Sequence, residues 1–343
     1  STYDDTLTGS NTVNTWKVTS NDTGTLNDIL TFTAIENLVG NAQADEFIFS
    51  DGVGLSGTAD GGMGGSNTLT YSAYSQINPV MVDLNTLTAT GTSGINNIQY
   101  LIGGSGADTL IGDGTNNQIS GGPGDDSLTG GLGDDTFYFG DGWGQDTIHE
   151  SLNGGTDTLN FSAVTVDLTF TFSGNLTITD PNGHIASHAA DNFEILVGGS
   201  RKDKFIILDA ITFSGALDGD AGEDTLDLSN YNSPVSISLT TSIITAGGIG
   251  LTVSNIEHYI GGKGDDLIVS GADDELLVGG PGNDTFVFSD NWGQDIVIEL
   301  DGDGEDIFDF SAVTKQITFI LGSIIVDDGN GNRTVYSGSS VEK

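Results

Sequence analysis

The chain has 343 residues, of which 49 are acidic and only 8 are lysine or arginine, so its formal net charge at pH 7 is −41. This charge excludes nucleic acid and anionic membrane surfaces as natural partners, because both attract cationic side chains. With 52 glycines, 5 prolines and no cysteine, the chain is neither collagen-like nor stabilised by disulfides. No stretch approaches the roughly 18 apolar residues that a membrane span requires.

A long internal repeat divides the chain. The segment Asn97–Gly104 returns as Asn255–Gly262, 158 residues later, and Phe161–Val164 returns as Phe310–Val313, 149 residues later. The offset shortens by nine residues while the flanking pattern survives, which indicates that nine residues form one structural module. We predict the end of a preceding repeat unit, a first unit and a second unit, at residues 1–35, 36–193 and 194–343.

Two blocks of nine-residue repeats lie inside these units, at residues 101–139 and 261–288. From Gly103 the chain reads GGSGADTLI, GDGTNNQIS, GGPGDDSLT, GGLGDDTFY, and from Gly261 it reads GGKGDDLIV, SGADDELLV, GGPGNDTFV. Positions one to six predict a turn, because glycine adopts positive φ without strain. Positions seven to nine predict a short strand whose middle side chain faces inward. Two repeats would complete one coil of a solenoid.

Aspartate at the sixth position would then stack on the aspartate of the next coil. Like charges in direct contact are destabilising, whereas a hard divalent cation between them would convert the pair into a site of oxygen ligands. The segments 80–84, 168–172 and 235–239 alternate as strands do, and no segment has the apolar spacing of a helix. The sequence therefore predicts an all-β chain with metal ions between its coils.

The tandem GGxGxDxUx units, in which U is apolar, resemble the repeats-in-toxin (RTX) family of haemolysin-type calcium-binding repeats. The spacers also resemble those of giant bacterial RTX surface proteins. The resemblance implies a right-handed parallel β-roll, a β-solenoid of nonapeptide coils that holds Ca²⁺ between successive turns. In that family one turn offers the carbonyls of positions two and four and its sixth-position carboxylate, and the next turn offers carbonyls one and three and its own carboxylate.

Carried onto this chain, the resemblance implies three calcium sites. The first uses Gly104, Gly106, Asp108, Gly121, Pro123 and Asp126. The second uses Asp113, Thr115, Asn117, Gly130, Leu132 and Asp135, with backbone oxygens of Asp113 and Thr115. The third uses Gly262, Gly264, Asp266, Gly279, Pro281 and Asp284.

Some units depart from this pattern. Asn117 lacks a carboxylate charge, so we expect the second site to be weaker. Glu275 stands where aspartate is expected and is one methylene longer, so no site is assigned there. Isolated units have no obvious partner two repeats away and are expected to hold Ca²⁺ poorly or only to form turns. They are centred on Asp45, Asn67, Asp203 and Asp224.

No catalytic motif is present, and we do not expect an enzyme. The sequence favours a calcium-binding structural module of a bacterial surface or secreted RTX protein, located outside the cell, that folds when Ca²⁺ binds. Asp4–Gly9 resembles the end of a nonapeptide and Val341–Lys343 aligns with Phe193–Ile195, so we expect self-association, end to end or by lateral contact. The alternatives are a non-catalytic RTX module of a secreted enzyme, or a glycan- or ice-binding segment of an adhesin.

Overall fold

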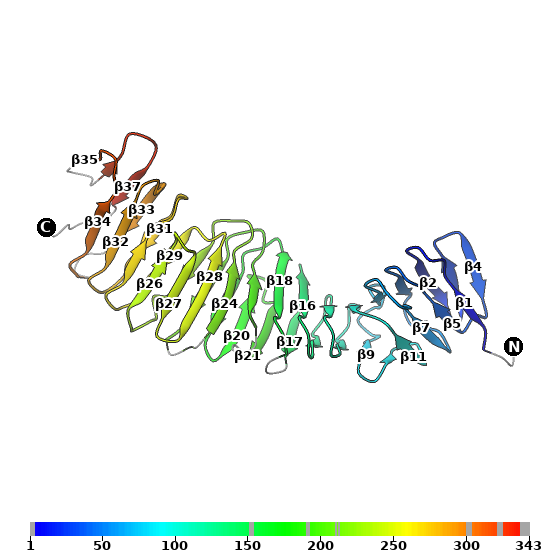
Figure 1. The fold of residues 1–343 in the computed structure, drawn as a ribbon. Coiled ribbons are helices and arrows are strands. Elements are labelled where there is room, and N and C mark those ends of the chain that lie inside the picture. The colour runs from blue at the N-terminus through cyan, green and yellow to red at the C-terminus, as the bar shows by residue number, and fades with distance from the viewer. Residues whose placement is uncertain are drawn as a thin grey trace. The chain divides into compact units, whose positions relative to one another are not determined.

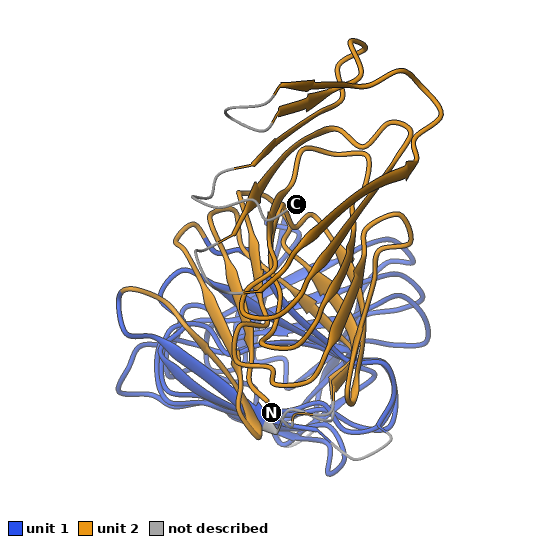
Figure 2. Ribbon diagram, turned by 90° about the vertical axis from the view of Figure 1, so that its left-hand side faces the viewer, with its two compact units in different colours: residues 1–164, 182–188 blue, residues 165–181, 189–343 orange. Residues whose placement is uncertain are grey.

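A computed structural model of the chain describes residues 4–150, 154–189, 193–209, 211, 213–299, 304–320 and 325–336. These residues form strands and turns, and no helix long and apolar enough to cross a membrane is found among them. They build two compact units, one from residues 1–164 and 182–188 and the other from residues 165–181 and 189–343 (Figures 1 and 2). The repeat boundaries at 36–193 and 194–343 divide the chain by internal similarity and stay a prediction. Val341–Lys343 lie outside the described residues.

The first unit is built from short strands joined by turns. Its strands are β1 (Thr6–Thr8), β2 (Thr15–Ser20), β3 (Thr23–Leu26), β4 (Leu30–Thr33), β5 (Asn37–Val39), β6 (Glu46–Phe49), β7 (Thr58–Asp60), β8 (Thr68–Thr70), β9 (Met81–Asp83), β10 (Thr88–Ala89), β11 (Gly94–Asn96), β12 (Tyr100–Ile102), β13 (Thr109–Ile111), β14 (Gln118–Ser120), β15 (Ser127–Thr129), β16 (Thr136–Gly140), β17 (Gln145–His149), β18 (Thr158–Ala163) and, apart from its last residue, β21 (Ile185–Ala189).

These strands stack into parallel ladders, as a solenoid requires. One ladder runs β2-β6-β8-β12-β14-β16-β18. A second runs β1-β5-β7-β11, and a third runs β9-β13-β15-β17-β21. The chain mostly alternates between the first ladder and one of the other two, although between β8 and β12 it passes through both β9 of the third ladder and β11 of the second. Antiparallel pairing is confined to β2-β3-β4 and β9-β10 among the described strands of this unit.

The second unit repeats the design. Its strands are β19 (Thr169–Phe172), β20 (Asn175–Thr179), β22 (Ile195–Val197), β23 (Lys204–Ile207), β24 (Phe213–Asp218), β25 (Thr225–Asp227), β26 (Val235–Ser238), β27 (Ile243–Ala246), β28 (Ile249–Ser254), β29 (His258–Ile260), β30 (Leu267–Val269), β31 (Leu276–Val278), β32 (Thr285–Ser289), β33 (Gln294–Ile298), β34 (Ile307–Ala312), β35 (Thr318–Ile320), β36 (Ile325–Asp327) and β37 (Arg333–Tyr336).

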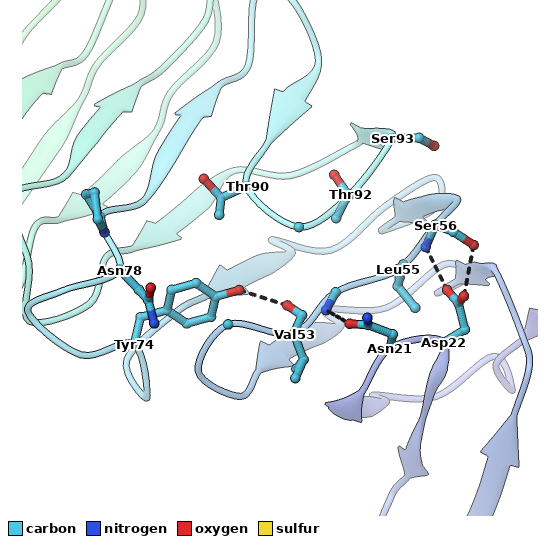
Figure 3. Close-up of a pocket in the computed structure, with 14 residues that line it drawn as sticks. Asn21, Asp22, Val53, Leu55, Ser56, Tyr74, Asn78, Thr90, Thr92 and Ser93 are labelled. Atoms are coloured by element: carbon cyan, nitrogen blue, oxygen red, sulfur yellow. Dashed lines mark hydrogen bonds between the residues drawn. The ribbon is translucent and has the colours of Figure 1, made fainter.

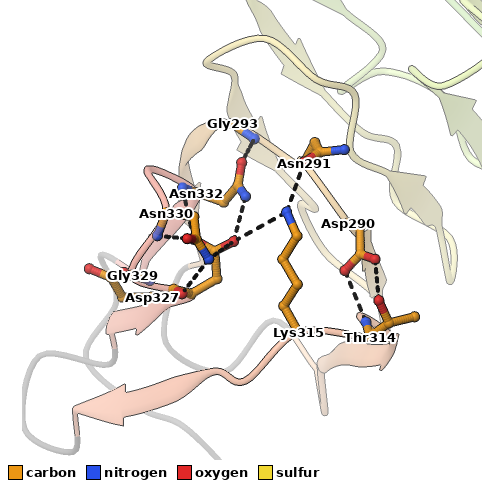
Figure 4. Close-up of polar contacts among 10 residues, drawn as sticks. Asp290, Asn291, Gly293, Thr314, Lys315, Asp327, Gly329, Asn330 and Asn332 are labelled. Carbon is orange, nitrogen blue, oxygen red and sulfur yellow. Dashed lines mark hydrogen bonds and ion pairs between the residues drawn. The ribbon is translucent and has the colours of Figure 1, made fainter.

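Its parallel ladders run β19-β23-β25-β29-β31-β33-β37 on one side. On the other side, β22-β24-β28 and β26-β30-β32-β34 are joined by the antiparallel pairs of β27. At its end, β35-β36-β37 form antiparallel pairs. Polar contacts hold this end: Lys315 donates to Asn291 at 3.0 Å and its ammonium lies 3.8 Å from the Asp328 carboxylate (Figure 4).

Strand register confirms the nine-residue module. Tyr100 pairs with Gln118 and Thr109 pairs with Ser127, so one coil contains 18 residues, or two nonapeptides. The apolar eighth positions stack inside the coils with no exposed surface, from Leu101 to Ile119 to Phe137. Each such side chain contributes roughly 1.5–3 kcal/mol by leaving water. The predicted all-β parallel solenoid of nonapeptide coils is confirmed.

Candidate metal sites

The sixth position of each nonapeptide ties its coil to the neighbouring coil. Asp126 accepts a hydrogen bond from the backbone N–H of Asp108 through Oδ1, at 2.8 Å. The Asp284 carboxylate makes the same bond to the N–H of Asp266, at 2.7 Å. The carboxylate of Asp108 uses both oxygens, accepting from Val80 at 2.7 Å and from Gly104 at 2.6 Å. A ladder of carboxylates therefore runs along the coil edge, each one bonded to the coil before it.

Glycine at the first position leaves room for this carboxylate. A Cβ atom on Gly103 would overlap both the carbonyl oxygen of Gly121 and Oδ2 of Asp108. In the second block, a Cβ on Gly261 would overlap the Gly279 carbonyl and lie against Oδ2 of Asp266 in the same way. Carbonyl and carboxylate oxygens of adjacent coils thus converge on one narrow space. Such a cradle of hard oxygen donors suits Ca²⁺, which prefers oxygen ligands in flexible geometry.

The coil that follows the Gly103 turn also packs closely against it, through glycines of its own. The carbonyl oxygens of Gly104 and Gly106 lie directly beneath Gly122 and Gly124, which have φ values of 92° and 141°. Only glycine adopts this conformation without strain, and a Cβ at either position would overlap the carbonyl. The repeated glycines are therefore explained by carbonyl oxygens that crowd the joint between coils.

Several buried carboxylate oxygens in these joints have no hydrogen-bond partner. They are Oδ2 of Asp126, Asp135 and Asp284, in residues that are at most 2% exposed. Burial raises the pKa of each of these carboxyl groups to about 7, neighbouring carboxylates add to the shift, and the backbone hydrogen bond opposes it. A buried group left unsatisfied costs about 1–3 kcal/mol. A cation between the coils would remove that cost and return the carboxyl groups to their ionised form.

The structure brings the three predicted residue sets together in these joints, and their role as calcium ligands stays a prediction. The second set differs as expected from its sequence. Asn117 uses its side-chain oxygen to accept from Asp113 at 2.7 Å, and its buried Nδ2 has no acceptor. An amide nitrogen offers the joint no metal ligand, so this set has one donor oxygen fewer than the first and third.

The isolated units also stack, at longer separations. The N–H of Asp45 donates to Asn67 at 2.8 Å, and the N–H of Asp203 donates to Asp224 at 2.7 Å. The partners thus stand 22 and 21 residues along the chain instead of 18, because longer turns are inserted between the stacked positions. The expectation that these joints bind Ca²⁺ poorly, or only form turns, stays a prediction.

A second ladder uses the fifth position and needs no metal. Asp125 accepts from the N–H of Gln145 at 3.0 Å, and Asp134 accepts from the N–H of Thr156 at 2.9 Å. These side chains bond to the following coil, whereas sixth-position side chains bond to the preceding one. Part of the chain's acidity therefore serves backbone hydrogen bonding.

Two carboxylate clusters were missed by the sequence analysis. Asp135, Glu150 and Asp157 place one carboxylate oxygen each within 4.8 Å of one another. Asp284, Glu299 and Asp306 form the same cluster in the second block, and each residue stands 149 positions after its counterpart. Both clusters lie where the last nonapeptide of a block meets the following coil. The separation along the chain there is 22 residues, as in the pairing of Thr136 with Thr158. The sequence did contain a signal for these clusters, because all three acidic residues recur at the same offset of 149 residues.

A cleft of about 680 Å³ lies elsewhere in the first unit (Figure 3). Its polar groups bond to one another: the hydroxyl of Tyr74 donates to the Val53 carbonyl at 2.8 Å, and Asp22 accepts from the backbone and hydroxyl of Ser56. Groups satisfied in this way do not converge on a ligand, so the cleft supports no assignment.

Comparison with known proteins supports the repeat pattern. The RTX calcium-binding nonapeptide repeat family, described in four copies, matches residues 90–127, 102–137 and 111–148. The C-terminal domain of the M10 serralysin peptidases matches residues 208–335. No curated protein matches the chain. The extracellular lipase LipA from Serratia marcescens is 19% identical over 81% of this chain and 43% of its own length, with a TM-score of 0.20. The chain contains calcium-binding repeats of the RTX type.

The glycine cradle can be tested by adding one methyl group. Gly103→Ala should weaken calcium binding and lower the calcium-bound stability, because its Cβ would displace the Gly121 carbonyl or the Asp108 carboxylate. Gly114→Ala is the matched control, since no atom lies within 4 Å of a Cβ there. Isothermal titration with Ca²⁺ measures both variants. Equal affinities for the two would show that the cradle does not hold the ion.

The carboxylate clusters can be tested by neutralising one member. Glu299→Gln keeps the shape and the acceptor for the Gly279 N–H but removes one charge. Affinity of one calcium site should fall by roughly an order of magnitude, because ligand charge tunes calcium affinity. Glu305→Gln, at an exposed position nearby, changes the net charge equally and should leave the affinity unchanged. Indistinguishable titrations would remove Glu299 from the site.

Proposed function

We propose that this chain is a structural module of a secreted or cell-surface protein that folds when it binds Ca²⁺ outside the cell. The observation that carries the proposal is the set of buried sixth-position oxygens without partners, as in Asp126 and Asp284. They line a cradle of carbonyl oxygens on adjacent coils. A cation that fills the joint binds the folded chain and not the unfolded one, so its binding free energy adds to folding stability.

The net charge supports an extracellular setting. At −41, the chain repels itself when cations are scarce, and it stays expanded in a form suited to export. Where Ca²⁺ is abundant, the joints fill and the coils stack. Secretion is also typical of the RTX and serralysin C-terminal families that match the chain.

The module has no catalytic role of its own in this proposal. A second candidate is the non-catalytic accessory module of a secreted enzyme, and the match of residues 208–335 to the serralysin C-terminal domain favours it. In either case chemistry would reside in another domain. Ice or glycan binding has weaker support, because the outward positions between Tyr100 and Thr158 in the first ladder include Gln118 and do not form a regular threonine row.

A role in a surface layer or adhesin would require copies of the chain to associate. This part of the proposal is supported by the resemblance of the spacers to those of giant bacterial RTX surface proteins.

Calcium-dependent folding is tested by circular dichroism. After chelation, titration with Ca²⁺ should produce the β signal cooperatively, whereas Mg²⁺ should substitute poorly because it requires tighter octahedral geometry. The double variant Asp126→Asn, Asp284→Asn should need more Ca²⁺ to fold. A β signal that is complete in chelator and indifferent to Ca²⁺ would contradict the proposal.

Association is tested separately by light scattering in millimolar Ca²⁺. The chain should show concentration-dependent growth in mass. A strict monomer at all concentrations would leave the folding module intact and remove the assembly role.

A further inference from the structure

One joint between coils differs between the two blocks. In the first block it is formed by Gly121, Asp126 and Asp146. In the second block the residues 149 positions later are Ser270, Glu275 and Asp295. Both sets occupy the same place: the N–H of Asp126 donates to Asp146 at 2.9 Å, and the N–H of Glu275 donates to Asp295 at 3.1 Å. The two joints have the same backbone arrangement and different side chains.

The joint of the first block has the features of the other candidate metal sites. Oδ2 of Asp126 and Oδ2 of Asp146 are both buried without a hydrogen-bond partner. Gly121 makes room for the first of these carboxylates, since a Cβ at that position would overlap Oδ2 of Asp126. Two buried carboxylate oxygens without hydrogen-bond donors are suited to a divalent cation.

Side-chain atoms fill the corresponding space in the second block. Ser270 has no exposed surface, and its hydroxyl donates to Oδ2 of Asp295 at 2.8 Å. The longer side chain of Glu275 reaches the carboxyl group of Asp295, and its Oε2 is buried without a hydrogen-bond donor. A hydrogen bond between two carboxyl groups requires a proton on one of them, because two carboxylates are both acceptors. The Ser270 hydroxyl would therefore fill space that an ion could occupy, and a proton would supply the positive charge that the ion brings.

We propose that a proton on Glu275 and the hydroxyl of Ser270 replace the calcium ion at this joint, so that the coils of the second block close here without metal. The comparison with the metal-binding joints rests on the proposed calcium-dependent function. The proton itself is argued from the contact between Glu275 and Asp295 and does not depend on that function.

The surroundings of Glu275 favour its protonated form. Asp273 and Asp274 precede it in the same turn, Asp295 faces it from β33, and Glu257 and Tyr259 face it from the β29 coil. Among the neighbours named here there is no lysine or arginine, and His258 of β29 pairs with Leu276, the residue after Glu275. Burial raises the pKa of Glu275 well above its ordinary value, and the contact with Asp295 adds to the shift against the Gly271 backbone hydrogen bond.

This shift has a definite sign for stability. A carboxyl group with a raised pKa in the folded state stabilises the fold while it is protonated, and this contribution is lost as the pH rises through the folded-state pKa. Between about pH 6 and pH 9, the folded chain holds one proton more than the unfolded chain at this position. The unfolding equilibrium constant should then rise by up to about tenfold per pH unit.

The first experiment measures urea unfolding in saturating Ca²⁺ between about pH 6 and pH 9, where metal-bound carboxylates stay ionised. Stability of the native chain should fall across this interval. Glu275→Gln keeps a donor to Asp295 and should abolish the fall, whereas Asp273→Asn, an exposed neighbour in the same turn, should retain it. A flat profile for the native chain, or an unchanged slope in Glu275→Gln, would overturn the proposal.

The second experiment counts bound Ca²⁺ by native mass spectrometry. Ser270→Gly with Glu275→Asp restores the first-block pattern and should add one ion. The reciprocal pair, Gly121→Ser with Asp126→Glu, should remove one ion. If restoring the pattern leaves the count unchanged, the native joint already binds metal or cannot bind it, and the replacement is wrong. If no variant binds Ca²⁺, the proposed function fails, and the pH profile still decides the proton at Glu275.

Discussion

The structure depends on one interaction, the hydrogen bond from a backbone N–H to the sixth-position carboxylate of the next coil. In Asp126 and Asp284 one oxygen makes this bond and the other remains buried without a partner. The same side chain thus joins two coils and creates the requirement for a cation between them. Backbone stacking and metal binding are therefore coupled, since one carboxylate group provides both the hydrogen-bond acceptor and the candidate metal ligand.

The acidic residues divide into two structural roles that composition alone does not separate. Sixth-position carboxylates are buried and face the joint, whereas fifth-position side chains such as Asp125 and Asp134 lie outside it and accept from the following coil. Because the two ladders bond in opposite directions along the solenoid, each coil is held from both sides. Cations in the joints would neutralise only the inner ladder, and the outer one keeps the surface strongly anionic.

The two blocks show that a joint of constant backbone geometry accepts different fillings. Both blocks end in a three-carboxylate cluster, Asp135 with its partners and Asp284 with its partners. They differ at Ser270 and Glu275, where side-chain atoms occupy the space left by Gly121 and Asp126. The requirement common to all joints is positive charge against a buried carboxylate, which either a divalent cation or a proton can supply. Their consequences differ, because proton occupancy varies with pH and ion occupancy varies with calcium concentration.

The sequence by itself determined the nine-residue module, the all-β solenoid and the stacking of Asp108 on Asp126, because glycine conformation, strand alternation and a constant separation are local properties. Only the tertiary structure decided the partners at irregular separations: Asp45 with Asn67, and Asp135 with the cluster around Glu150. Insertions in the turns change the separation along the chain and leave the stacking unchanged, so a fixed period cannot find these pairs. The filling of the joint at Ser270 likewise depends on where a longer side chain ends, which register and packing decide.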